Sequence, residues 1–221
     1  MIPLKDTIPS RKLPLMTWTL IILNIGAFIY QQIIGEELNN FLISTYGLIP
    51  VKVIGNIFEG NWRLLLPFVS YTFLHGGWIH LISNVWALWL FGDNVEDRMG
   101  KISFVLFYLS MGIIAGLTHL ISEPVSPIAV IGASGAIAGV MGAYFVMYPQ
   151  SKVITLIPVF FIPLFVPIPA TIYLGFWFVS QISAAITQHV RMTANIAWWA
   201  HVGGFVAGMF LYRFFIKLKR L

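Results

Sequence analysis

Most side chains of this chain are apolar, so the few that could do chemistry inside an apolar environment stand out. Ser134 lies in the Gly- and Ala-rich stretch IGASGAIAGVMGAY, and His201 lies in the similar stretch NIAWWAHVGGFVAGMF. A hydroxyl beside an imidazole can act as a nucleophile and its general base, which later returns the proton to a leaving amine. Spacing alone leaves two other interpretations open, a packing role for Ser134 and a satisfied buried histidine for His201.

His80 and Asn84 could support such chemistry from a second helix. They are four residues apart and therefore share one helix face. Imidazole and amide groups can donate hydrogen bonds to an oxyanion, and so can the free N–H groups at a helix start beside Ser134. Gly132 and Gly135 flank the serine and let a substrate backbone come close. His80 and Asn84 could instead form an interhelical hydrogen-bonded pair.

Acid and metal chemistry are less favoured in the core. The eight acidic residues all fall in tails, loops or span ends, at Asp6, Glu36, Glu37, Glu59, Asp93, Glu96, Asp97 and Glu123. A site built from His75, His80 and His201 is a weaker alternative, because no carboxylate is at hand to orient the ligands. The chain has no cysteine, which excludes thiol chemistry and disulfides.

The composition places these residues in an integral membrane protein. Only 10% of the residues are charged and 58% are hydrophobic, whereas about 25% are charged in a typical soluble domain. Apolar runs near 20 residues in length predict helices, because the strands of a membrane barrel alternate over about 10 residues. The net charge of +5 lies in short loops and tails. A role in membrane orientation therefore explains it better than nucleic-acid binding.

We predict an all-α membrane protein with six transmembrane helices in one domain, residues 1–221. The spans are expected at about 18–34, 78–91, 102–121, 133–148, 170–187 and 197–216. Segment 35–77 is expected to fold on the membrane surface, partly as amphipathic helix. The proline-rich segment 153–169 is expected to be interfacial or re-entrant. Residues 1–16 and 217–221 are expected to be tails.

The basic residues predict the orientation. Six spans put both termini on one side, which leaves only Lys52, Arg63 and Arg191 of the 13 Lys and Arg residues on the other side. Since Lys and Arg are enriched in cytoplasmic loops, both termini are expected in the cytoplasm. The beginning of the chain lacks a signal-peptide cleavage pattern, so the first helix is expected to stay in the membrane, most simply a prokaryotic plasma membrane.

Small residues predict that the fourth and sixth spans pack closely. They recur at a spacing of four in both spans, as Gly135, Gly139 and Ala143 and as Ala200, Gly204 and Gly208. Such stripes let helix backbones approach each other. In the predicted topology Ser134 and His201 lie at similar depth, so a hydrogen bond between them is geometrically reasonable.

Together these motifs resemble the rhomboid family of intramembrane serine proteases. GxSG alone is weak, but four motifs in order on the expected helices are specific, and the resemblance extends over nearly the whole chain. The matching residues are the pair Trp62–Arg63, the H-x4-H-x3-N set of His75, His80 and Asn84, the GxSG set Gly132 to Gly135, the set Ala200 to Gly203 and the acidic–basic pair Glu96 and Arg98.

The resemblance implies a role for each site residue. Ser134 corresponds to the nucleophile and His201 to the general base, which together form a dyad. His80 and Asn84, with the Ser134 N–H, correspond to the oxyanion donors. Residues with an expected structural role are Trp62, Arg63, Glu96, Arg98, Gly132 and Gly135.

The resemblance also implies the partners. Transmembrane or membrane-anchored proteins would be cleaved near the outer membrane face, without metal or cofactor. The fifth helix and the loop 187–195 would be the mobile gate. Two alternatives are an inactive relative that binds membrane clients and a small transporter.

One position departs from the family pattern. Many relatives carry an aromatic residue four positions after the nucleophile, stacked on the histidine, and here that position is Ala138. Either another ring, from Trp198, Trp199 or Phe205, takes that place, or the imidazole is held less firmly.

Overall fold

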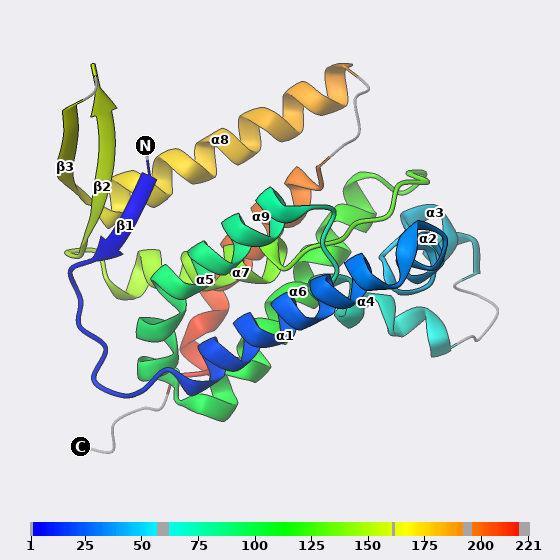
Figure 1. Cartoon of the computed structure of the whole chain (residues 1–221), viewed down its shortest axis with the longest axis horizontal. Coiled ribbons are helices and arrows are strands. Elements are labelled where there is room, and N and C mark those ends of the chain that lie inside the picture. The colour runs from blue at the N-terminus through cyan, green and yellow to red at the C-terminus, as the bar shows by residue number, and fades with distance from the viewer. Residues whose placement is uncertain (1, 57–61, 161, 192–195, 217–221) are drawn as a thin grey trace.

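The protein is described by a computed structural model that covers residues 2–56, 62–160, 162–191 and 196–216. Helices dominate the fold, and a small sheet lies at one end of the molecule (Figure 1). The elements in chain order are β1 (Ile2–Asp6), α1 (Leu15–Ile33), α2 (Gly35–Tyr46), α3 (Pro50–Asn56), η2 (Trp62–Leu65), α4 (Pro67–Ser70), η3 (Tyr71–Phe73), α5 (Trp78–Met99), α6 (Lys101–Ser122), α7 (Ser134–Met147), β2 (Lys152–Val159), β3 (Ile162–Pro169), α8 (Ala170–Arg191), α9 (Trp198–Leu211) and η4 (Tyr212–Phe214).

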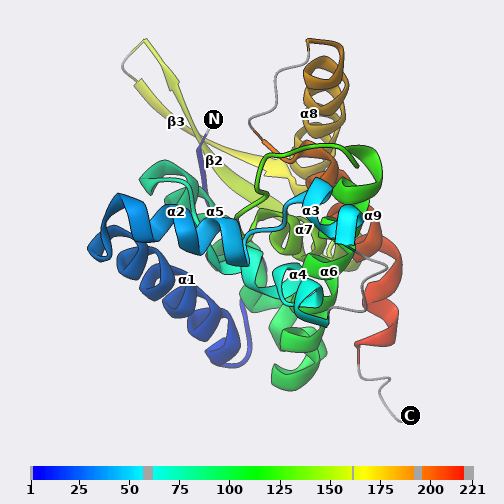
Figure 2. The same cartoon turned by 90° about the vertical axis from the view of Figure 1, so that its right-hand side faces the viewer.

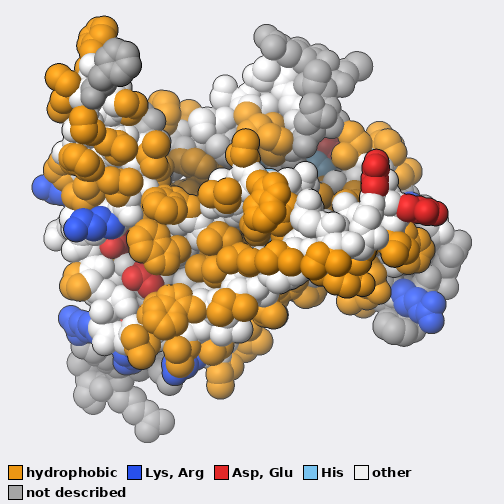
Figure 3. Space-filling model, in the orientation of Figure 1, with side chains coloured by type: hydrophobic (Ala, Val, Ile, Leu, Met, Phe, Trp, Pro, Cys, Tyr) orange, Lys and Arg blue, Asp and Glu red, His pale blue; other side chains and the backbone are white. Residues whose placement is uncertain are grey.

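Each of the six predicted spans contains a helix, namely α1, α5, α6, α7, α8 and α9. Three of them, α1, α6 and α8, are long and apolar enough to cross a bilayer. Apolar side chains cover much of the face seen in Figure 3, and most of the Lys and Arg side chains in that view gather at one end. The chain is therefore an integral membrane protein, and a count of six crossings stays a prediction.

The close approach of α7 and α9 is confirmed. A Cβ added at Gly204 would lie 2.1 Å from the carbonyl oxygen of Gly135, and one added at Gly208 would lie 2.0 Å from that of Gly139. Both distances are far below van der Waals contact, so Gly204 and Gly208 of α9 lie directly against the backbone of α7. Figure 2 shows α7 inside the bundle, with α6 and α9 beside it.

Segment 35–77 is partly helical, as predicted. Its helices bury a small apolar cluster that includes Leu48, Phe68 and Tyr71. The Tyr71 hydroxyl donates to the carbonyl of Gly112 in α6 over 2.7 Å, and the Tyr71 carbonyl accepts from the N–H of Gly132 over 2.9 Å. The segment therefore holds the stretch that precedes α7, and its location at the membrane surface stays a prediction.

The all-α expectation is incomplete, because the proline-rich segment forms a β-hairpin. Strands β2 and β3 pair antiparallel from Lys152 with Pro169 to Val159 with Ile162, and β1 completes the sheet in the order β1-β2-β3. Proline disrupts a helix but is tolerated on an edge strand, where its missing N–H faces away from the ladder. The edge strand β3 contains Pro163, Pro167 and Pro169. These prolines are separated by even numbers of residues, so their backbone nitrogens all face the same edge of the strand, as this rule requires.

Part of the expected N-terminal tail is an ordered strand. β1 pairs with β2, and its Pro3 carbonyl accepts from the Trp86 indole N–H over 2.6 Å. The Asp6 carboxylate accepts from the Asn94 amide over 2.8 Å and from the Tyr144 hydroxyl. These bonds fix the beginning of the chain to α5 and α7. The expected tail 217–221 lies outside the described residues.

Candidate active site

The backbone turn before α7 determines how Ser134 is presented. Gly132 has φ +120°, a conformation that L side chains rarely adopt, and a Cβ there would lie 2.5 Å from Nε2 of His80. Only glycine fits this position, since any side chain would displace the imidazole. Ser134 follows as the first residue of α7, where the backbone N–H groups of a helix start have no partner within the helix.

Ser134 and His201 lie together although 67 residues separate them in the chain. The Ser134 hydroxyl oxygen and Nε2 of His201 are 2.7 Å apart. Only 9% of the His201 side chain is exposed. The contact depends on the glycines described above, because both side chains project from neighbouring turns of two helices whose backbones nearly touch.

A glutamine and two indole rings surround the other side of the His201 ring. The Gln181 side-chain oxygen is 2.8 Å from Nδ1 of His201. The Trp177 ring lies 6.0 Å from the imidazole centroid at an interplanar angle of 31°, and the Trp198 ring lies 5.7 Å away, edge-on at 88°. Of the rings that the sequence suggested, Trp198 is in contact with the imidazole.

Sequence reasoning missed Trp177 and Gln181. They come from α8 and lie four residues apart on one helix face, 20 or more residues before His201. Two signals in the sequence could have identified them. A glutamine in an apolar span is a polar group that needs a partner, and an aromatic residue one turn earlier shares its face.

His80, Asn84 and His75 form a second polar group opposite the serine. The Asn84 amide nitrogen lies 3.0 Å from Nε2 of His75, whose Nδ1 is 3.3 Å from the carbonyl of Phe73. Burial, together with the neighbouring His80, lowers the pKa of His75 to about 4, so its ring is neutral at pH 7. A neutral ring that donates from Nδ1 accepts at Nε2, which orients the Asn84 amide.

The His80 ring is oriented in a similar way. The N–H of Gly76 donates to Nδ1 of His80 over 3.5 Å, which leaves the proton on Nε2. That Nε2 faces Gly132, two residues before Ser134, and the Asn84 amide nitrogen lies 3.6 Å from the Cβ position of Gly132. Two side-chain donors therefore face the turn that leads to the serine.

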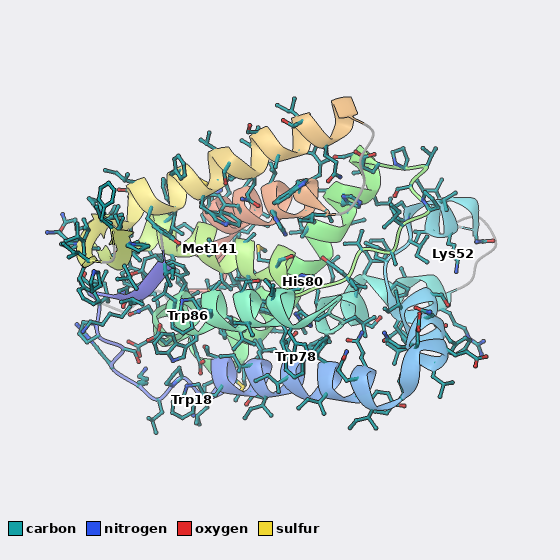
Figure 4. All side chains as sticks on the ribbon, turned by 45° about the horizontal axis from the view of Figure 1, so that its top comes forward. Trp18, Lys52, Trp78, His80, Trp86 and Met141 are labelled. Carbon is teal, nitrogen blue, oxygen red and sulfur yellow. The ribbon has the colours of Figure 1, made fainter. Side chains whose placement is uncertain are left out.

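One cavity of about 1110 Å³ is lined by Ser134, His201, Gln181, His80 and Asn84. Its walls include residues of α5 and α8, and it extends from the serine past Leu90 and Met141 to Pro3 of β1. Figure 4 shows His80 midway along the molecule, with Lys52 at the far right. Among the residues that the structure describes, no group of three or more His, Cys, Asp or Glu side chains is placed to hold a metal ion.

The residues with an expected structural role occupy different positions. Glu96 accepts from the N–H groups of Met16 and Thr17, over 3.0 and 2.7 Å, and therefore caps the start of α1. Arg98 and Arg63 are exposed. Gly135 lies against α6, since a Cβ there would be 2.6 Å from that of Ala115. The Trp62 side chain lies outside what the structure describes.

A family model of the Rhomboid domain matches residues 60–218, which is well over half of the chain. The chain belongs to the rhomboid family. The predicted family is thereby confirmed, and the match includes every residue of the candidate site.

Similar proteins include several from this family. The chain is 32% identical over 200 residues to the rhomboid protease GluP of Bacillus subtilis, which covers 89% of this chain and 34% of that protein. It is 27% identical over 159 residues to the mitochondrial rhomboid protein 1 of Saccharomyces cerevisiae, which covers 69% of this chain and 42% of that protein. It is 41% identical over 79 residues to the chloroplastic rhomboid-like protein 11 of Arabidopsis thaliana, and this alignment covers 36% of this chain and 28% of that protein. The chain thus spans less than half the length of each of these relatives.

Proposed function

We propose that this rhomboid family member is an intramembrane serine endopeptidase that uses a dyad of Ser134 and His201. The observation that carries the proposal is the 2.7 Å contact between the hydroxyl and the imidazole, inside a cavity that donor groups face. His201 removes the hydroxyl proton as the oxygen attacks a peptide carbonyl. It then delivers that proton to the leaving amine, and the resulting acyl-enzyme is hydrolysed by water in the reverse sequence.

The oxyanion donors in this proposal are the His80 Nε2–H, the Asn84 amide and the backbone N–H of Ser134. The tautomer of His80 and the orientation of Asn84 support this role, since both leave an N–H on the side of Gly132. Donors that are fixed before the reaction stabilise the developing charge without reorganisation, and losing one typically costs about 100- to 1000-fold in kcat.

The proposed substrates are transmembrane or membrane-anchored proteins. The cavity extends between α5 and α8 along apolar residues such as Leu90, Phe91 and Met141. An apolar wall suits a membrane-spanning segment, while the polar end at Ser134 receives the peptide bond. No nucleic acid and no cofactor is part of the proposal.

We also propose that cleavage occurs toward the outer face of a prokaryotic plasma membrane, with both termini in the cytoplasm. Ser134 begins α7, whereas Tyr144 near the other end of α7 donates to Asp6 of β1. Ser134 therefore lies at the end of α7 away from the sheet. The end that carries β1 also carries most of the Lys and Arg side chains seen in Figure 3, which is typical of a cytoplasmic side.

A fluorophosphonate probe tests the proposal, because it reacts with an activated serine. We expect the purified wild-type protein to be labelled and to cleave a membrane-anchored reporter, and Ser134→Ala and His201→Ala to lose both activities by more than about 1000-fold. Ser110→Ala is the matched control, since the Ser110 hydroxyl donates only to its own helix, at the carbonyl of Leu106. Undiminished labelling in Ser134→Ala contradicts the proposal, and normal client turnover by that variant favours a client-binding protein.

A further inference from the structure

Gln181 is a buried amide in the middle of a mostly apolar helix. It lies on α8, only 7% of it is exposed, and its side-chain oxygen approaches Nδ1 of His201 to 2.8 Å. No motif of the sequence analysis contains this residue. A buried polar side chain in a membrane helix requires a partner, and here that partner is the candidate general base.

The orientation of the amide follows from its other contacts. The nitrogen of Gln181 donates to the carbonyl of Trp177 over 3.2 Å and to the hydroxyl oxygen of Ser180 over 2.9 Å. A backbone carbonyl only accepts, so the NH₂ end must face Trp177 and the oxygen must face His201. Because an amide oxygen accepts only, the imidazole carries its proton on Nδ1.

This hydrogen bond selects one tautomer of His201. With the proton on Nδ1, the lone pair of Nε2 points at the Ser134 hydroxyl 2.7 Å away, as a general base requires. If the other tautomer were present, Nε2 would carry a hydrogen and could not accept the serine proton. Serine hydrolases with a triad obtain the same selection from a carboxylate, whereas here the acceptor at Nδ1 is the amide oxygen of Gln181.

We propose that Gln181 is a positioning residue that fixes the tautomer and orientation of His201, as a neutral third member beside the dyad. This inference rests on the proposed protease function. It also accounts for Ala138, which is fully buried and provides no ring for the imidazole. Orientation comes instead from α8, through the amide of Gln181 and the tilted ring of Trp177.

The position of α8 therefore matters for the base. Only 22% of the apolar stretch of α8 is buried, against 44% for α6, so α8 is held by fewer neighbours. In Figure 1, α8 diverges from the bundle toward its C-terminal end. If α8 moves away from α9, His201 loses the hydrogen-bond acceptor Gln181 and the ring contact with Trp177. The imidazole is therefore held in this orientation only while α8 packs against α9.

Three variants test the inference in the full chain. Gln181→Met keeps the length of the side chain and removes the acceptor, whereas Gln181→Glu restores an acceptor. Gln32→Leu is the matched control, an exposed glutamine of α1. The measurements are kcat and KM for a membrane-anchored reporter as a function of pH, the rate of fluorophosphonate labelling at Ser134, and thermal unfolding in detergent.

We expect Gln181→Met to lower kcat and the labelling rate by about 10- to 100-fold, with KM changed less than about twofold. A positioned general base typically accelerates a reaction by about 100- to 10,000-fold, and the variant is expected to lose part of that acceleration. Gln181→Glu is expected to retain most of the wild-type kcat, with the acid limb of kcat against pH moved to higher pH. A carboxylate stabilises the protonated imidazole, and the base must be deprotonated to act. The titratable groups that share the cavity with His201 are unchanged in both variants, namely Tyr71, His80, His119, Glu123 and Tyr173.

A merely structural role for Gln181 gives a different result. In that case the variants lower the unfolding temperature but leave kcat and the acid limb of the folded protein as in wild type, and the inference is overturned. If Gln181→Met does not fold, the Gln181→Glu variant is sufficient as a test. An acid limb of its kcat against pH at the wild-type position then overturns the inference. A wild-type protein that neither cleaves nor labels contradicts the proposed function itself, so the two failures are distinguishable.

Discussion

Among the helices that contact α9, α7 and α8 do so in opposite ways. Against α7, the glycines of α9 lie so close that a single added methyl group would meet backbone, as the 2.0 Å distance from Gly208 to the Gly139 carbonyl shows. Against α8, the contact is made by large side chains, including Trp177, Phe178 and Gln181, against His201 and Phe205. At the first interface, backbone contact fixes the distance between the two helices. At the second, the contacts come from side chains of α8, so they depend on the position of that helix.

This difference divides the tasks in the candidate site. The α7–α9 interface fixes where Ser134 and His201 lie, because the two backbones cannot approach further and lose packing if they separate. The α8–α9 interface fixes how the imidazole is turned. If α8 moved, the serine and the histidine would therefore stay neighbours, whereas the orientation of the imidazole would change.

The largest expected effect on stability comes from adding one methyl group to the close interface. Gly208→Ala places a Cβ 2.0 Å from the Gly139 carbonyl, so the helices must separate. We expect a loss of about 3 kcal/mol of unfolding free energy, the upper end of typical overpacking costs. Gly175→Ala on α8 is the matched control. Its Cβ would meet nothing nearer than Phe145 at 4.0 Å, so we expect a gain of about 0.5 to 1 kcal/mol from helix propensity. Thermal unfolding in detergent measures both, and equal effects of the two variants would erase the contrast between the interfaces.

An intermediate effect is expected on the α8 side. Trp177→Leu removes the tilted ring from His201 and keeps an apolar side chain. Aromatic pairs contribute about 0.5 to 1.5 kcal/mol beyond their buried area, so kcat/KM is expected to fall by roughly 2- to 12-fold, with little change in unfolding temperature. Phe176→Leu, at the neighbouring exposed position of α8, serves as control. A drop in unfolding temperature as large as that of Gly208→Ala would mean that α8 is as firmly packed as α7.

The smallest effect is expected at the sheet from which α8 emerges. Burial raises the pKa of the Asp6 carboxyl above its ordinary 3.8, although the Tyr144 hydrogen bond lowers it in part. The folded protein therefore binds this proton more tightly than the unfolded chain does. The resulting stabilisation is complete below the ordinary pKa and is lost as the pH rises through the raised pKa. We expect the unfolding temperature of wild type to fall relative to that of Asp6→Asn as the pH rises above the ordinary pKa of 3.8. Parallel pH profiles for the two proteins would contradict this account.

The sequence predicted more of the helices than of the segments between them. Apolar runs and small-residue stripes located the helices at the six spans and paired α7 with α9 through Gly204 and Gly208. The prolines of segment 153–169 excluded a regular helix. They gave no sign that β1, nearly 150 residues earlier, would add a strand. Strand pairing depends on which edges meet, and no local pattern encodes that.

The motifs and composition alone determined the family, the membrane setting and the residues that could do chemistry. Residue types carry that information, because few polar side chains are compatible with an apolar span and the spacing of His80 and Asn84 assigns them to one face. The tertiary structure decided how His201 is surrounded. Gln181 and Trp177 reach the imidazole from α8, and a hydrogen bond between side chains 20 residues apart depends on the distance and rotation between two helices. Side-chain packing in three dimensions sets that geometry, and the spacing of residues along the chain does not contain it.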